Sequence, residues 1–184
     1  MKSSISFGQN PFVDADAIRA GEHHYEKALD ILNNKGSVSK ACELLNQALS
    51  LGIGEAGYKL FVLHTQGCYL KDGDKEVGEI VMRAADAVKP SGKAKKIVGI
   101  RLTNQGMIKE AEIYLIAARD MGVEDTARHI AAMKTHQPGM TLNERCMDAL
   151  NYLVLHSDVD TDKLRDTYIQ LASKLGEGYE NKLH

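Results

Sequence analysis

Several residue types are scarce in this chain of 184 residues, and each scarcity excludes some structures or sites. There is no tryptophan and there are only three prolines, whereas alanine and leucine are abundant, which favours helices. The three cysteines, Cys42, Cys68 and Cys146, form no CxxC pair and are odd in number. They therefore indicate neither a zinc site nor a full set of disulfides, and free thiols are typical of a reducing compartment.

Long apolar runs and a strong charge of one sign are also missing. No run of 18 apolar residues exists, so we expect no membrane-spanning segment. The first residues, MKSSISFGQNPFVDADA, lack the apolar core of a secretory signal. A net charge of −2 gives no general attraction to nucleic acids or membranes. We therefore expect a cytoplasmic protein, with secretion without a removable signal as the open alternative.

Apolar residues instead recur at spacings of three and four nearly throughout, which predicts an all-α chain. We expect helices near residues 14–34, 38–51, 54–67, 74–88, 91–105, 107–121, 123–135, 142–156 and 161–175. Gly36 and Gly106 should supply turns between paired helices, and Gly52 and Gly122 should close helices in the left-handed conformation. Thr141 with Glu144 has the spacing of a capping box.

One segment of the sequence is repeated at a distance of seventy residues. NNKGSVSKACELLNQALSLG, which starts at Asn33, matches NQGMIKEAEIYLIAARDMG, which starts at Asn104, and Ala41 aligns with Ala111. Val77 and Cys146 occupy the equivalent position in the second and fourth repeats. Successive repeats are therefore 36, 34 and 35 residues apart. We expect one domain over 14–184 after a flexible arm at 1–13, with repeats at 21–52, 54–90, 91–122 and 123–156 and a capping helix at 161–175.

The period and its small residues resemble the tetratricopeptide repeat and its Sel1-like variant. Gly99, Leu102, Gly106, Ala111 and Leu115 stand where that family places packing residues. The resemblance implies a right-handed α-solenoid of about four antiparallel helix pairs with a C-terminal capping helix. It also implies that exposed residues on the first helix of each pair bind a partner in a concave groove. Carried onto this chain, these residues are His23, Glu26, Asp30 and Asn33 in the first repeat and Lys93, Lys96, Ile100 and Thr103 in the third.

A basic segment overlaps the third repeat. No acidic residue occurs between Asp86 and Glu110, a stretch that contains Lys89, Lys93, Lys95, Lys96, Arg101 and Lys109. Lys93, Lys95, Lys96 and Arg101 predict a docking surface for an acidic segment of another protein, with a solvated face as the alternative. The family's peptide-carboxylate clamp is absent, because the first repeat offers acids at those positions. No aromatic residue is interleaved, so nucleic acid is a poor fit.

Residue types that could carry chemistry are present without the required spacing. The seven histidines contain no HxxxH pair, and neighbouring His23 and His24 point about 100° apart on a helix. Asp158, Asp160 and Asp162 begin a calcium-loop pattern, but Lys163 and Ile169 stand where glycine and glutamate are needed. We therefore expect no catalytic residue, no metal and no cofactor.

The sequence thus predicts a non-catalytic protein-binding module that acts as an adaptor, a secretion chaperone or an inhibitor of the immunity-protein kind. One alternative is an enzyme or nucleotide-binding protein, which would bring residues such as His24, His64, Cys68 and His129 into one cleft. The other is a self-assembling structural protein, and a homodimer is compatible with either non-catalytic reading. Fold alone does not choose among these roles.

Overall fold

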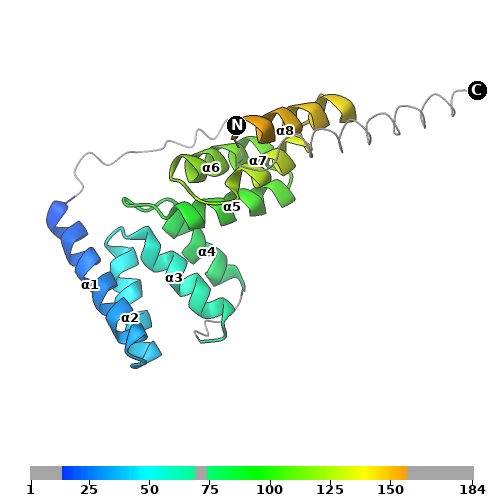
Figure 1. Cartoon of the computed structure of the whole chain (residues 1–184). Helices are drawn as coiled ribbons and strands as arrows, with labels where there is room; N and C mark the ends of the chain where they lie inside the picture. Colours follow the sequence, from blue (N-terminus) through cyan, green and yellow to red (C-terminus); the bar gives the residue numbers. More distant parts are fainter. Residues whose placement is uncertain (1–13, 69–73, 157–184) are drawn as a thin grey trace, which may run out of the picture. The chain divides into compact units, whose positions relative to one another are not determined.

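The computed structural model describes residues 14–68 and 74–156 of the chain, and these residues form eight helices (Figure 1). The helices are α1 (Ala15–Asn33), α2 (Val38–Ser50), α3 (Gly54–Thr65), α4 (Asp74–Ala85), α5 (Gly92–Asn104), α6 (Ile108–Asp120), α7 (Thr126–Lys134) and α8 (Leu142–His156). The described part contains no strand beyond one isolated bridge between Ile53 and Lys89. The expected all-α class is confirmed. The arm at 1–13 and the ninth helix at 161–175 lie outside the described residues.

Contacts between residues divide the chain into two compact units, residues 1–94 and 95–184. The division falls in the first turn of α5. In the first unit, α1 packs on α2, α2 on α3, and α3 on α4. In the second, α6 packs on α7 and α7 on α8. Within each unit, these helices therefore pack on the helix that follows them in sequence, while the single-domain organisation stays a prediction.

Small residues set the distance between helices in the first unit. A Cβ atom added at Gly57 of α3 would lie 2.8 Å from the Cβ of Ala84 on α4 and 3.0 Å from Cδ1 of Leu49 on α2. Three helices therefore meet at this glycine. Ala41 and Ala48 on α2 are fully buried, which is the close-packing role that the repeat predicts for them.

The segment before α5 is tied to the turn before α3 by backbone hydrogen bonds. Gly54 N–H donates to the carbonyl of Lys89 at 2.8 Å, and Lys89 N–H donates to the carbonyl of Gly52 at 2.9 Å. Ser91 is buried, and its Oγ accepts from the N–H of Ala94 at 3.3 Å, which caps the start of α5.

The second unit has its own core. Ala111 and Leu115 of α6 pack with Ile130 and Met133 of α7, and side chains from α5 and α8 lie against them. Gly99 of α5 allows close approach, because an added Cβ would lie 2.6 Å from Cγ of Leu115. This is the packing position that the repeat assigns to Gly99.

The helix ends follow the predicted chemistry with one difference. Gly52 and Gly122 have positive φ, and each ends its helix with the same pair of hydrogen bonds, so their predicted role is confirmed. Gly106 closes α5 with a φ of 77°. In the first pair, however, Lys35 takes the left-handed conformation, with a φ of 53°, instead of Gly36.

The difference arises because α1 ends one residue earlier than α5 in the repeat. Lys35 N–H donates to the carbonyl of Leu32, and Gly36 N–H donates to that of Ile31 at 2.8 Å. Gly36 is still required, since an added Cβ would lie 2.9 Å from Cγ2 of Ile31 and 3.0 Å from its carbonyl oxygen. The glycine allows close approach here, and the lysine makes the turn.

The capping box at the start of α8 is confirmed. Glu144 N–H donates to Oγ1 of Thr141 at 3.3 Å, and Thr141 N–H donates to Oε2 of Glu144 at 2.8 Å. These bonds lower the pKa of the Glu144 carboxyl, with the backbone bond from Thr141 as the largest cause. The sequence therefore places the first turn of α8 correctly.

Candidate partner-binding surfaces

The four residues proposed on the first helix form one exposed line along α1. His23, Glu26, Asp30 and Asn33 are all exposed, whereas Ile18, Gly21 and Ala28 of the same helix are buried. Spacings of three and four residues place the exposed set on one side of the helix. We call these four residues the α1 stripe. Asp30 accepts a hydrogen bond from the side chain of Asn34 at 2.9 Å, so the other three carry the more adaptable polar groups.

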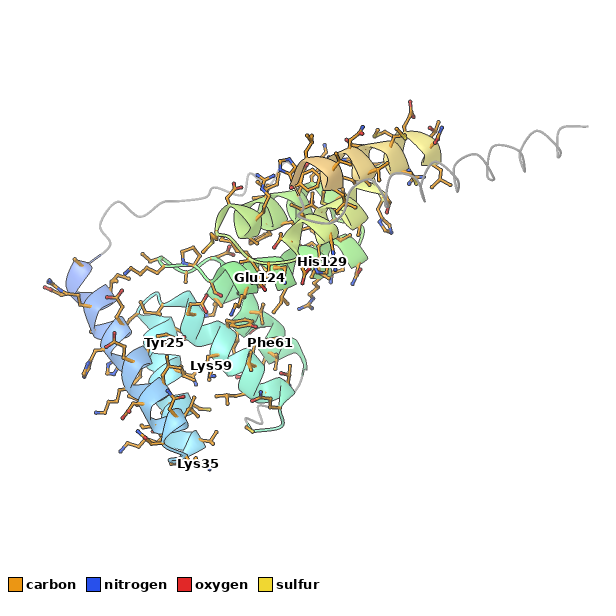
Figure 2. The ribbon with its side chains drawn as sticks, viewed as in Figure 1. Tyr25, Lys35, Lys59, Phe61, Glu124 and His129 are labelled. Carbon is orange, nitrogen blue, oxygen red and sulfur yellow. The ribbon has the colours of Figure 1, made fainter. Side chains whose placement is uncertain are left out.

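Two half-buried residues beside the α1 stripe are not indicated by any motif. The pKa of Tyr25 is raised, first by burial and then by the charge of Glu55 on α3. Nδ1 of His24 is buried and has no hydrogen-bond partner in the described residues. Tyr25, Lys59 and Phe61 are labelled on α1 and α3 in Figure 2. No sequence signal identifies the interaction of Tyr25 with Glu55, because the two residues lie on different helices.

The four residues proposed on one face of α5 divide into two groups. Ile100 packs against the core of the second unit, and the hydroxyl of Thr103 donates to the carbonyl of Gly99 at 2.9 Å. Both side chains therefore have roles inside the protein. Lys93 is exposed, and its Nζ lies 5.4 Å from the ring centroid of Tyr58 on α3. Nζ of Lys96 donates to the carbonyl of Glu124 at 3.0 Å.

The remaining cations of the basic segment point in several directions. Lys95 Nζ lies 5.5 Å from the ring centroid of Tyr114 on α6, and Lys89 forms an ion pair with Glu22 on α1. Arg101 and Lys109 are exposed. Because each helical residue turns about 100°, Lys95 and Arg101 do not share the face of α5 that carries Lys96. The structure therefore does not gather these charges into one patch on α5.

Lys93, Lys95 and Lys96 each face a neutral group, whereas Lys89 faces a carboxylate. An aromatic ring or a carbonyl orients an ammonium group without neutralising it, unlike the carboxylate that faces Lys89. The charge of Lys96 also affects α7, where the pKa of His129 is lowered by burial first and by Lys96 second, with Asp125 opposing. Figure 2 labels His129 and Glu124 in this region. In the second unit, Lys95, Lys96 and Arg101 thus lie on different sides of α5.

The residues named for the enzyme alternative are divided between the two units. His24, His64 and Cys68 belong to the first unit and His129 to the second. Among residues 14–68 and 74–156, no three His, Cys, Asp or Glu side chains are placed to hold a metal ion. Cys42 is buried, which raises its pKa, with nearby Cys68 as a smaller cause. The acidic residues at 158–162 lie outside the described residues.

No protein-family model, curated protein or solved structure matches this chain significantly. The resemblance to helical repeats therefore depends on the residues themselves. In the described residues, no helix is both long enough and apolar enough to cross a membrane.

Proposed function

We propose that this chain is a helical-repeat protein of the tetratricopeptide-like or Sel1-like kind that binds another protein without catalysing a reaction. Its finer architecture would be a right-handed solenoid of about four helix pairs. The observation that carries the proposal is the repeated closing of helices at Gly52 and Gly122. Both turns use the same hydrogen bonds, and both follow a helix with buried alanines at corresponding positions. Stacked pairs of this kind leave the first helices free to present side chains.

The α1 stripe is the surface we assign to the partner in the first unit. Its residues are polar, exposed and aligned, and side chains elsewhere on α1 provide the packing. In the second unit, the exposed Arg101 supplies positive charge for an acidic segment of the partner. An adaptor, a secretion chaperone and an inhibitor would all use such surfaces, and the identity of the partner distinguishes them.

A matched pair of charge reversals tests the proposal. Glu26 on α1 and Glu43 on α2 are both exposed, so Glu26→Lys and Glu43→Lys make the same change on the first and second helices of one pair. A photo-reactive residue at position 23 would first identify the partner in cells of the native source. The purified partner should then bind the Glu26→Lys variant about tenfold more weakly, a change typical of a moderate contact.

The Glu43→Lys variant should bind like the natural chain, because its position lies on the second helix. Equal affinity of both variants would remove the α1 stripe from the proposal. If position 23 cross-links only to a second copy of this chain, the self-assembly alternative replaces it. In the second unit, Arg101→Glu compared with Lys109→Glu applies the same logic, since both side chains are exposed on successive helices.

A further inference from the structure

Methionine has an unusual distribution in this protein. Six methionines lie in the described residues, and five of them are exposed, with exposed fractions between 36% and 47%. We call these five the surface methionines, which are Met82, Met107, Met121, Met140 and Met147. Leucine shows the opposite distribution, since six described leucines are buried and only two are exposed. Because methionine is normally among the most buried residue types, these positions point to a property that methionine has and leucine lacks.

The main chain next to the surface methionines is held by backbone hydrogen bonds. Met107 N–H donates to the carbonyl of Leu102 at 2.9 Å, and the carbonyl of Met107 accepts from the N–H of Ala111 at 2.9 Å. Met121 N–H donates to the carbonyl of Ala117 at 3.1 Å. These bonds involve no side-chain atom, so a chemical change at the sulfur leaves them in place. The exposed thioethers are therefore accessible without any opening of the helices.

Met133 provides the contrast within the same chain. It is fully buried on α7 and packs with Ala111, Leu115 and Ile130 in the core of the second unit. An oxygen atom added to its sulfur would be a buried acceptor without a partner, which costs free energy. The structure thus shields the one methionine whose modification would disturb a core, among the six methionines that it describes.

We propose that the surface methionines are a site of reversible oxidation whose substrate is a peroxide. The thioether sulfur attacks one oxygen of hydrogen peroxide, so that an S–O bond forms and the O–O bond breaks. The transferred oxygen gives its proton to the departing hydroxide, which leaves as water. Methionine is oxidised by two electrons to the sulfoxide, and the peroxide is reduced by the same two electrons.

A dithiol supplies the return step. It gives two electrons to the sulfoxide and becomes a disulfide, while the sulfoxide oxygen takes the two thiol protons and leaves as water. Each surface methionine therefore removes one peroxide per cycle. Leucine fits the same space but can carry out neither step. None of the surface methionines lies on α1, so this chemistry is independent of the α1 stripe.

A short treatment of the full-length protein with hydrogen peroxide tests the proposal. Peptide mass spectrometry measures the sulfoxide at each methionine separately, in the folded protein and in urea. In the folded protein, the surface methionines should react no more than about threefold more slowly than in urea, whereas Met133 should react at least about tenfold more slowly. Circular dichroism and the urea midpoint should be unchanged after oxidation of the surface sites. Methionine sulfoxide reductases for both sulfur configurations, with dithiothreitol as the dithiol, should restore the original mass.

Two leucine variants provide the matched control, because leucine conserves the volume of methionine. One variant combines Met82→Leu, Met107→Leu, Met121→Leu, Met140→Leu and Met147→Leu. Its intact mass should show five fewer oxygen atoms per chain than that of the natural protein after the same treatment. The other variant, Met133→Leu, should gain as many oxygen atoms as the natural chain.

Three results would overturn the proposal. The first is surface methionines that are protected as strongly as Met133, which would mean that another molecule or a second copy covers them. The second is loss of the fold when only the surface sites are oxidised. The third is sulfoxides on the folded protein that the reductases leave unchanged.

Discussion

The close approach of α5 and α6 at Gly99 gives a prediction whose sign can be worked out from the structure. In a helix interior, glycine to alanine usually stabilises by about 1 kcal/mol. At Gly99, however, the new Cβ would lie 2.6 Å from Cγ of Leu115, whereas carbon atoms pack at about 3.5–4.0 Å. Leu115 is fully buried with Ile130 and Met133 and cannot move without disturbing them. Overpacking costs about 1–3 kcal/mol, which offsets or exceeds the propensity gain, so Gly99→Ala should lower the free energy of unfolding by about 0–2 kcal/mol.

Removing the obstructing side chain should reverse the sign. Leu115→Ala alone should destabilise by about 2–5 kcal/mol, because it leaves a cavity in the core. In that background the added methyl group no longer collides, so Gly99→Ala should stabilise by about 1 kcal/mol through helix propensity. The coupling energy of the double-mutant cycle should therefore be about 1–3 kcal/mol.

Urea unfolding followed by circular dichroism measures the four free energies, with hydrogen exchange of α6 as the check that one transition is observed. An osmolyte keeps the Leu115→Ala variants folded if they are marginal. The reasoning is refuted if Gly99→Ala stabilises the natural chain, or if its effect is the same in both backgrounds. Either result would mean that α5 does not approach α6 as closely as the structure shows.

Three further predictions concern turns, acid and thiols. Residues 35 and 106 both have positive φ, which glycine adopts at a lower cost than lysine. Lys35→Gly should therefore stabilise the protein by about 0.5–1 kcal/mol, and Gly106→Lys should destabilise it by about 1 kcal/mol. Urea unfolding measures both changes, and effects of the same sign would contradict this. The pKa of Glu144 is lowered from its usual 4.5, so its contribution to stability is present above that pH and is lost as the pH falls through the folded pKa. Unfolding curves of the natural chain and Glu144→Gln should therefore converge in acid, and a constant difference from about pH 7 to about pH 3 would contradict the assignment. Alkylation should modify exposed Cys68 before buried Cys42, whose pKa is raised, and peptide mass spectrometry that finds the reverse order would reject the described burial.

Local signals in the sequence predicted the helices with small errors at their ends. The eight described helices begin and end within three residues of the expected positions. The largest difference at a start is α7, which begins at Thr126 instead of 123, because the residues before it close α6. Val123 N–H donates to the carbonyl of Ala118, and Asp125 then takes a left-handed conformation with a φ of 58°. A hydrophobic pattern cannot show this, because it contains no information on which residues donate hydrogen bonds to the last carbonyl groups of a helix.

The candidate surface was predicted less completely. The resemblance to helical repeats gave the α1 stripe as exposed positions, and these four residues are exposed, because a helix with one buried side must present the other. The same reasoning gave Ile100 and Thr103 as binding residues, whereas the structure uses them for packing and for a hydrogen bond to Gly99. The tyrosines beneath Lys93 and Lys95 were missed, since they lie on other helices far along the chain.

The sequence by itself determined the all-α class, the pairing period and the caps, because these depend on residues within one or two turns of each other. Only the tertiary structure decided which of those residues have a second role. The choice of Lys35 instead of Gly36 for the left-handed turn depends on how α1 ends against Ile31. The lysines near α5 contact different kinds of group, which are an aromatic ring, a carbonyl or a carboxylate from another part of the chain. Contacts between helices are made by side chains that are distant in sequence, and no local pattern specifies which of them meet.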